Sequence, residues 1–388
     1  MKKRILLGIT SGIAIYKVLD LCSRLVKADY ELEIIMTENA TKMVSPLVFE
    51  TIGRCKVHKD MFHNGHHEEV EHIELGKRAD LFIIAPTTVN TLAKIAHGIG
   101  DNLLTSTVLA YDKPIILALS ANTNMIENPA TLENIETLRS RGFNFIEPNS
   151  GLLACNTVGR GRLAEPSEIF ETIEDYFIPK DLNGKRILVT AGPTKEDIDP
   201  VRFISNRSSG KMGFAIAKKA YQRGAEVVLI YGNTILEPPI GPKNIKISNN
   251  EELKDEIEKH FGNVDSIIMA AAPCDFKVEN YSVEKIKTKD KLTLNLIENE
   301  DILKYFGNKK GHQKIIGFAA ETFDVLENAK KKLISKNCDF IIANDVSSKD
   351  SGFDVDYNRV SIVSKEEIID YPLLSKKEVA DKVLDLLL

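Results

Sequence analysis

The sequence predicts an α/β protein made of two doubly wound domains, at residues 1–180 and 181–388. Short apolar runs alternate with longer amphipathic stretches, which is typical of parallel strands covered by helices on both faces. The alternation pauses at residues 176–184, where Pro179, Asn183 and Gly184 favour turns, and then starts again. A chain of 388 residues is long enough for two such domains, each with a core. Both halves are therefore expected to be Rossmann-like.

The first half is expected to begin with a buried strand at Arg4–Ile9 and a helix at about Ala14–Lys27, where the helical pattern is amphipathic. Each later strand is a short apolar run, and helical stretches lie between these runs. Right-handed crossovers would join them into one sheet. The further predicted elements are strands at Leu32–Met36, Ala79–Ala85, Pro114–Leu119 and Phe143–Ile146, and helices at Val89–Ala96, Leu103–Ala110 and Ala130–Arg139.

The second half repeats the same cycle after a new strand at Arg186–Ala191. The chain is expected to close on an amphipathic helix at Val379–Leu387. The elements expected between these two are strands at Glu226–Tyr231, Ser266–Ala271, Leu292–Ile297, Lys314–Ala319 and Phe340–Ala343, and helices at Met212–Arg223, Glu251–His260 and Val325–Lys336.

Composition narrows the functional class. The net charge is −5, without the basic excess of a nucleic-acid binder, and no apolar run is long enough to cross a membrane. The five cysteines form no CxxC pair, which argues against a zinc knuckle or a disulfide framework. We therefore expect a cytoplasmic protein that binds neither nucleic acid nor membrane.

Polar residues follow several predicted strands of the first half, at the edge where doubly wound sheets bind ligands. Residues 8–17 (GITSGIAIYK) form a strand-to-helix turn that suits an anion, or a plain turn in which Ser11 caps the helix. Asn90 and Asn122 follow the third and fourth strands, where their amides can donate and accept hydrogen bonds.

Histidines and one cysteine are candidates for proton transfer. His72 could act as a general base, but four histidines precede it, so a metal cluster must also be weighed. Their spacing fits no zinc template, and we expect these four to be solvated loop residues. Cys155 lies in a glycine- and arginine-rich segment, a candidate flap that could lower its pKa, although a buried inert thiol is the alternative. The four upstream histidines are His58, His63, His66 and His67.

The second half carries a long segment, residues 199–213 (DPVRFISNRSSGKMG), that opens a helix. It is not a P-loop, because Ser205 stands in place of the first glycine and Met212 in place of the magnesium-binding hydroxyl residue. It is still a suitable anion cradle. Lys285 and its neighbours form an alternating lysine run, which is either a solvated edge or a phosphate-binding face.

The first-half motifs together resemble the flavin-containing cysteine decarboxylase family, in particular the phosphopantothenoylcysteine decarboxylases. Residues 85–91 (APTTVNT) are similar to that family's Pro-x-Ser-Ala-Asn-Thr box, and 151–162 (GLLACNTVGRGR) to its flap. Residues 119–126 (LSANTNMI) keep the asparagine and second methionine of its Pro-x-Met-Asn-x-x-Met-Trp box but not the proline, first methionine or tryptophan. The resemblance implies a flavodoxin-like flavoprotein domain.

The resemblance implies FMN as the cofactor that oxidises the substrate thiol to a thioaldehyde, which then serves as the electron sink for loss of CO₂. It implies that His72 assists this oxidation, that Asn122 binds the substrate carboxylate and that Cys155 donates the last proton. The FMN-binding residues that it implies are Ser11, Gly12, Thr37, Asn90, Thr105 and Ser106.

The second half resembles phosphopantothenate–cysteine ligase over residues 184–388, through residues 188–194 (LVTAGPT) and 199–213. The resemblance implies a C-terminal ligase domain in which CTP activates 4′-phosphopantothenate as an acyl nucleotide that cysteine then attacks, with Mg²⁺ and Lys285 stabilising the phosphate charge. Asn206 would hold the acyl intermediate, and no magnesium ligand is identified. The nucleotide-binding residues implied are Asp275, Lys285, Asn299, Asp301, Ile302, Phe318, Lys332 and Lys336.

The two halves together resemble the bifunctional enzymes that make 4′-phosphopantetheine in coenzyme A biosynthesis. The resemblance implies a homo-oligomer of trimeric flavoprotein domains and paired ligase domains, which gives a dodecamer. Three alternatives remain: a chain active in only one half, a non-catalytic flavin-binding regulator, and an NAD-dependent oxidoreductase. The absence of a GxGxxG motif argues against the last.

Overall fold

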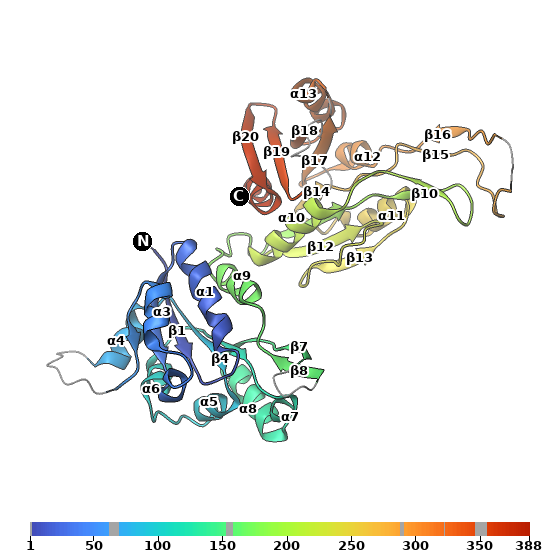
Figure 1. Cartoon of the computed structure of the whole chain (residues 1–388). Coiled ribbons are helices and arrows are strands. Elements are labelled where there is room, and N and C mark those ends of the chain that lie inside the picture. The colour runs from blue at the N-terminus through green and yellow to red at the C-terminus, as the bar shows by residue number, and fades with distance from the viewer. Residues whose placement is uncertain (1, 62–69, 153–157, 288–290, 322, 346–354) are drawn as a thin grey trace. The chain divides into compact units, whose positions relative to one another are not determined.

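The computed structural model describes residues 2–61, 70–152, 158–287, 291–321, 323–345 and 355–388. The chain forms two compact units, Met1–Phe177 and Ile178–Leu388 (Figure 1). Each unit is described by itself below. Within the described residues, no helix is long and apolar enough to span a membrane.

The first unit is built on a six-stranded parallel sheet. Its strands lie in the order β3-β2-β1-β4-β5-β6, so the chain adds strands on one side of β1 up to β3 and on the other side from β4 onward. In doubly wound sheets a crevice opens between the two strands at this switch, here β1 and β4. The strand β4 is buried along its whole length, as expected of a strand covered on both faces. The bounds are β1 Arg4–Ile9, β2 Glu31–Met36, β3 Val57–His58, β4 Leu81–Thr87, β5 Ile115–Leu119 and β6 Asn144–Ile146.

Helices cover both faces of this sheet, and each face has its own apolar core. One face packs against α1 (Ile15–Lys27), α3 (Pro46–Gly53) and α9 (Pro166–Tyr176). The α1 helix buries Val18, Leu21 and Leu25 at the spacing of one helical stripe. The other face packs against α4 (Glu71–Arg78), α5 (Val89–Ala96), α6 (Leu103–Ala110) and α8 (Pro129–Ser140), and the shorter elements are α2 (Glu38–Thr41), α7 (Thr123–Ile126) and the hairpin β7 (Asn149–Leu152) and β8 (Val158–Arg162).

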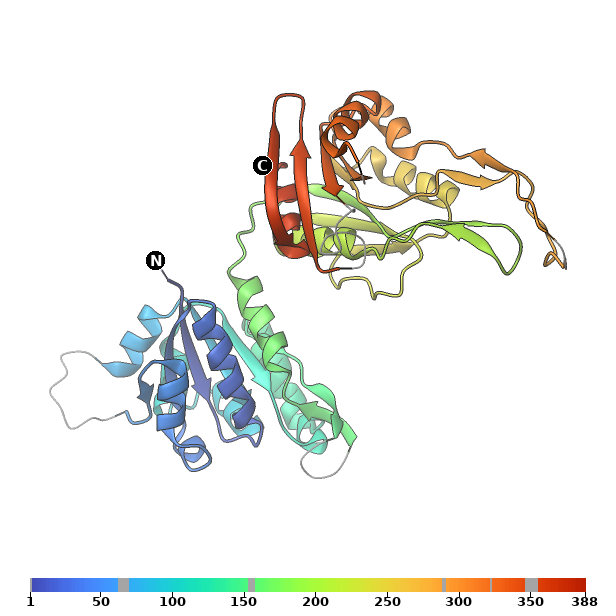
Figure 2. The same cartoon turned by 45° about the horizontal axis from the view of Figure 1, so that its top comes forward.

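The second unit is built on an eight-stranded sheet in the order β13-β12-β9-β14-β17-β18-β19-β20. The first six strands in this order are parallel, and β19 and β20 extend the sheet as an antiparallel hairpin, seen clearly in Figure 2. The strands are β9 Arg186–Ala191, β12 Glu226–Tyr231, β13 Lys243–Lys246, β14 Ser266–Met269, β17 Lys314–Glu321, β18 Phe340–Asp345, β19 Tyr357–Val363 and β20 Ile368–Ser375.

Two layers of helices enclose the second sheet. One face carries α10 (Lys211–Gln222) and α14 (Lys376–Asp385), which pack on each other. The other face carries α11 (Asn250–Phe261), α12 (Ile302–Lys309) and α13 (Val325–Ser335). Two two-stranded ribbons extend from the body of this unit and touch each other (Figures 1 and 2); they are β10 (Lys195–Asp197) with β11 (Phe203–Ser205), and β15 (Phe276–Val278) with β16 (Leu296–Glu298).

The α/β class and the doubly wound arrangement of both halves are confirmed. One predicted strand, Leu292–Ile297, is largely wrong, because the strand in this region is β16 at Leu296–Glu298. The alternating Leu292 and Leu294 imitate a half-buried strand, but both side chains remain exposed because this segment lies outside the main sheet.

Candidate functional site

The turn after β1 lies directly against the turn after β4. The peptide bond between Ala85 and Pro86 is cis, and the Thr10 hydroxyl donates to the Pro86 carbonyl at 2.6 Å. The Thr88 N–H donates to the Thr10 hydroxyl oxygen at 3.1 Å. A Cβ atom on Gly12 would stand 3.0 Å from Pro86 Cγ, a contact so tight that the proline ring would have to shift to admit a larger residue. Gly12 therefore lies at the crevice between β1 and β4.

The α1 helix begins at Ile15 with Ala14 as its N-cap, so the alternative that Ser11 caps this helix is wrong. Among the described residues no side chain caps α1, which leaves its first turn suited to an anionic partner. Thr37 follows β2 and caps α2, accepting from the Ala40 N–H at 3.3 Å. Both turns lie at the carboxyl edge of the parallel sheet.

The start of α5 supplies further polar groups at the same edge. Thr88 caps this helix, its hydroxyl oxygen accepting from the Thr91 N–H at 3.3 Å. Asn90 lies in the first turn of α5 and is exposed to solvent. The amide of Asn90 is therefore accessible for a ligand at the carboxyl edge.

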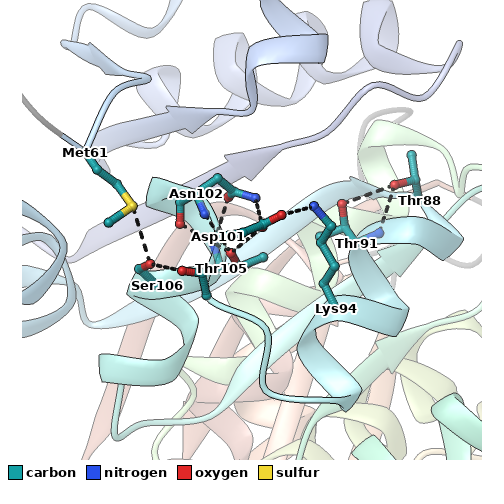
Figure 3. Close-up of polar contacts among 9 residues, drawn as sticks. Met61, Thr88, Thr91, Lys94, Asp101, Asn102, Thr105 and Ser106 are labelled. Atoms are coloured by element: carbon teal, nitrogen blue, oxygen red, sulfur yellow. Dashed lines mark hydrogen bonds and ion pairs between the residues drawn. The ribbon is translucent and has the colours of Figure 1, made fainter.

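The start of α6 is held by a capping box, shown in Figure 3. Asn102 Oδ1 accepts from the Thr105 N–H at 3.1 Å, and the Asn102 N–H donates to the Thr105 hydroxyl oxygen at 3.3 Å. Lys94 pairs with Asp101 at 2.5 Å and ties α5 to the loop before α6. The buried Thr105 thus shapes the helix start. Ser106 is partly exposed, and its hydroxyl donates to the Gly100 carbonyl at 3.2 Å.

Asn122 caps α7 after β5, its side-chain oxygen accepting from the Asn124 N–H at 2.9 Å. The hairpin β7–β8 lies against this loop, because the Ala121 N–H donates to the Gly161 carbonyl at 3.1 Å. A Cβ atom on Gly161 would stand only 2.1 Å from the Ala121 carbonyl oxygen, so a larger residue would separate the hairpin from the loop. Cys155, in the segment that joins the two strands, lies outside the described residues.

His72 lies in the first turn of α4 and is partly exposed. The expectation that His58 is a solvated loop residue is wrong: it lies in β3 and its side chain is only 8% exposed. His58 Nδ1 is 2.5 Å from an oxygen of Glu71, the residue before His72. His63, His66 and His67 lie outside the described residues. Among the residues that the structure describes, no group of three or more His, Cys, Asp or Glu could hold a metal ion.

The second unit contains a cavity of about 560 Å³ at the carboxyl ends of its parallel strands. The cavity brings together segments that are far apart in the sequence, namely the loop before α10, the end of β14, the start of α12 and the side chains of α13. All but one of the predicted ligase residues line it: Asn206, Asp275, Asn299, Asp301, Ile302, Phe318, Lys332 and Lys336.

The exception is Lys285, which is exposed and does not belong to the residues that line the cavity. It follows β15 in one of the two ribbons. The neighbouring Ile286 is fixed by buried Asp199, whose carboxylate accepts from the Ile286 N–H at 3.2 Å and from the Arg202 N–H at 2.9 Å. The unit therefore holds Lys285 on the ribbon, apart from the cavity lining.

The wall of the cavity rests on a hydrogen-bond network whose buried member Asn250 was not predicted from the sequence. Thr194 donates from its hydroxyl to the Asn250 side-chain oxygen at 2.6 Å, and Asn250 donates to the Cys274 carbonyl at 2.8 Å. Asn299 donates to the same carbonyl at 2.9 Å, and Asn206 donates to the Pro273 carbonyl at 2.8 Å. Thr194 belongs to the motif at residues 188–194. Asn250 is the first residue of α11, and no motif in the sequence marks it as part of a site.

One end of the cavity carries an ion pair between Asp301 and Lys336, whose Nζ lies 2.9 Å from an Asp301 oxygen. Burial opposes ionisation of Asp301, but the Lys304 N–H and the Lys336 ammonium outweigh it and lower the pKa of this carboxyl below its usual value. Lys211, another lining residue, is the first residue of α10 and pairs with Asp356 at 2.9 Å. The cavity thus presents ammonium groups at two places, as an anionic ligand requires.

Comparisons with known proteins agree with this division of the chain. The Flavoprotein family model matches residues 1–177, and the model of the DNA/pantothenate metabolism flavoprotein C-terminal domain matches residues 182–388. The coenzyme A biosynthesis bifunctional protein CoaBC of Bacillus subtilis (strain 168) is 41% identical over an alignment of 388 positions, which covers 98% of this chain and 96% of that protein.

The CoaBC protein of Borreliella burgdorferi is 42% identical over an alignment of 390 positions, which covers 99% of each chain. A solved structure of the C-terminal domain of a CoaBC protein is 42% identical, covers 54% of this chain and 96% of its own, and has a TM-score of 0.47. The family predicted from the sequence is therefore confirmed: this chain belongs to the bifunctional CoaBC enzymes of coenzyme A biosynthesis, which join a flavoprotein decarboxylase domain to a ligase domain.

Proposed function

We propose that the second unit ligates cysteine to 4′-phosphopantothenate with CTP, and that the first unit decarboxylates the product to 4′-phosphopantetheine with FMN. The observation that carries this proposal is the cavity of the second unit, which gathers eight predicted ligase residues from distant parts of the chain. Its ammonium groups and the anion cradle at residues 208–210 suit the phosphates of a nucleotide and of the acid substrate.

In the ligase reaction, the substrate carboxylate attacks the α-phosphorus of CTP and pyrophosphate leaves. The cysteine amine then attacks the acyl carbon, loses a proton, and CMP departs. Lys332 and Lys336 would offset the phosphate charge, while Asn206 would orient the acyl group through its amide. Mg²⁺ would enter with the nucleotide, since this ion is usually held by phosphates and one or two carboxylates. Lys285 would help to stabilise the phosphate charge from its place on the ribbon.

The turns of the first unit fit FMN, because uncapped α1, the hydroxyl of Thr37 and the exposed Asn90 offer the donors that a phosphate and a flavin ring need. When bound, FMN would supply the two-electron oxidation of the substrate thiol and its later reversal. Ser11 and Gly12 would contribute the turn after β1, and Thr105 and Ser106 the start of α6.

Three residues of the first unit would act on the substrate. His72 would accept a proton during thiol oxidation, and Asn122 would hold the carboxylate that leaves as CO₂. Cys155 would donate the proton that completes the thiol product. The hairpin β7–β8, which is hydrogen-bonded to the Asn122 loop, carries the segment with Cys155 and so supports a shared site.

We further propose that the chain forms a homo-oligomer, a dodecamer, with trimeric flavoprotein domains and paired ligase domains. Exposed apolar side chains in both units support such contacts, among them Ile13 and Tyr16 beside the turn after β1, and Phe276 and Val283 on the ribbon. We also propose a cytoplasmic location, because the four described cysteines are free thiols, as expected in a reducing compartment.

The test is a coupled assay of the purified protein with 4′-phosphopantothenate, cysteine and Mg²⁺, with CTP or ATP as the nucleotide and product analysis by mass. We expect 4′-phosphopantetheine with CTP and much less product with ATP. Accumulation of 4′-phosphopantothenoylcysteine would contradict an active decarboxylase. No product with either nucleotide would contradict both activities and favour the flavin-binding regulator.

A further inference from the structure

His58 stands out among the described histidines because it is buried within a charged cluster that the decarboxylation steps above do not use. Its Nδ1 lies 2.5 Å from Glu71 Oε1, and its Nε2 lies 3.8 Å from Glu33 Oε2. The contact with Glu71 is within hydrogen-bond distance, whereas Glu33 lies farther away on the other side of the ring. Lys56 Nζ also lies 3.8 Å from Glu71 Oε1, at the exposed side of the cluster.

The cluster joins the sheet to the first turn of α4. His58 stands opposite Ile35 in the parallel pairing of β3 with β2, and Ile35 is fully buried. Glu33 comes from β2 and Glu71 is the first residue of α4, next to His72. The imidazole therefore links a fixed strand to the helix that carries the proposed catalytic histidine.

This contact takes the place of the side-chain N-cap that usually holds the start of a helix. The N-cap of α4, Val70, has no side chain that can accept from the first-turn amides, and no side-chain cap is formed. On the far side, α4 packs on α6, and Leu75 is buried between that helix and the sheet. Packing thus fixes the apolar face of α4, whereas the polar face near His72 is held through Glu71.

We propose that His58 is a positioning residue for decarboxylation: by holding Glu71 against β2 and β3, it fixes the first turn of α4 and with it the direction of the His72 side chain. This inference rests on the proposed role of His72 in thiol oxidation. Displacement of a catalytic group by about 1 Å can cost roughly a hundredfold in rate, so a residue outside the reacting atoms can carry a large effect.

The experiment uses the full-length, flavin-loaded protein with the variants His58→Ala, His58→Gln, Glu71→Gln and His72→Asn. His97→Gln is the matched control, since His97 is an exposed histidine at the end of α5. The readouts are the single-turnover rate of flavin bleaching by 4′-phosphopantothenoylcysteine, substrate affinity, flavin content, and hydrogen exchange of the α4 amides. Flavin content reports that the first unit remains folded, and ligation of cysteine, measured on each sample, reports the same for the second unit.

We expect His58→Ala and Glu71→Gln to slow flavin bleaching roughly ten- to a hundredfold with unchanged substrate affinity and ligation. Hydrogen exchange of the first-turn amides of α4 should become faster in these two variants. His58→Gln, which can still donate to Glu71, should recover part of the rate of flavin bleaching. In the His72→Asn background, His58→Ala should cause no further loss, because both changes remove the same function.

Bleaching rates within twofold of wild type for both His58→Ala and Glu71→Gln, beside a slow His72→Asn, would overturn the positioning role alone. A full additional loss from His58→Ala in the His72→Asn background would overturn it as well, because His58 would then act independently of His72. A normal rate for His72→Asn would overturn the proposed role of His72, and the positioning role with it.

Discussion

At the scale of single residues, burial decides which thiols can react. Burial raises the pKa of Cys55 and of Cys338 to about 12, and it raises the pKa values of Cys22 and Cys274 above the ordinary value of a thiol. A thiol reacts as its thiolate, so a raised pKa and a covered sulfur both suppress reaction. Cys274 illustrates this, because it lines the ligase cavity yet is only 4% exposed.

We therefore predict that iodoacetamide at pH 8 leaves Cys22, Cys55, Cys274 and Cys338 unmodified in the native protein on a timescale of minutes. Peptide mapping by mass spectrometry measures the modification of each cysteine, and the urea-unfolded protein is the control in which all should react. Fast labelling of Cys274 in the native state would contradict its protection by burial.

The lowered pKa of Asp301 predicts a pH-dependent contribution to stability. Ionised Asp301 favours the folded state above its unfolded-state pKa of about 3.9, and this stabilisation is lost as the pH falls through the lower folded-state value. Asp301→Asn keeps a capping side chain for α12 but removes the charge. Wild type should therefore be the more stable protein at pH 6, and the difference should shrink below pH 4.

Urea unfolding between pH 3.5 and pH 6 measures this difference. The control is Asp197→Asn, since Asp197 is an exposed carboxylate on β10. A difference between wild type and Asp301→Asn that stays constant over this range would show that the Lys336 ion pair does not contribute through the charge of Asp301.

The resemblance of the second half to the ligase family indicated eight of the residues that line the cavity, among them Asn206 and Lys336. The sequence did not indicate Asn250, which reaches the cavity wall from the start of a helix, or the burial of His58. A histidine next to lysine and aspartate reads as a loop residue, and only the pairing of β3 with β2 brings its ring between Glu33 and Glu71. Side-chain contacts between distant segments leave no local pattern.

At the scale of elements, central strands were predictable because continuous burial selects apolar runs, as in β4 and β14. The antiparallel hairpin of β19 and β20 and the short ribbons were missed. The β20 strand is mostly exposed or half-buried and carries mixed residues, so the apolar run that marks a buried strand is absent. Segment 292–297 shows the reverse case, in which an alternating pattern occurs on an exposed ribbon.

The contact between α10 and β9 depends on Gly213, which is the basis of the next prediction. A Cβ atom at this position would stand 2.5 Å from Ala191 Cβ and 2.8 Å from the Thr190 carbonyl oxygen. Gly213→Ala should therefore push α10 from the sheet, cost about 1–3 kcal/mol of unfolding free energy, and impair ligation because the start of α10 lines the cavity.

Denaturant unfolding and the CTP-dependent ligation assay measure the two effects of Gly213→Ala. Gly262→Ala is the matched control, because a Cβ atom there would meet no atom within 4 Å. Equal stability of the two variants would contradict the close packing of α10 on β9.

At the scale of the whole molecule, the described residues form two apolar cores in each unit, one on either side of its own sheet, and each of these cores is built from the residues of one unit. This explains how one chain can carry two chemistries with different requirements. In the proposed function, the flavin chemistry uses the turns of the first sheet, whereas nucleotide activation uses the cavity of the second. The ligation product is the decarboxylation substrate. Joining the two units in one chain therefore provides the ligase and the decarboxylase in equal amounts.

Separate cores predict separate unfolding. Calorimetry of the full chain should show two transitions, since a single cooperative transition is expected only where one core spans the structure. FMN should raise the midpoint of one transition and CTP with Mg²⁺ that of the other, because a ligand stabilises the unit that binds it, by about 2.7 kcal/mol at a hundredfold excess over its Kd. Gly213→Ala identifies the transitions, since this variant should lower only the one that responds to CTP. A single transition that both ligands shift together would show that the two units unfold as one cooperative body.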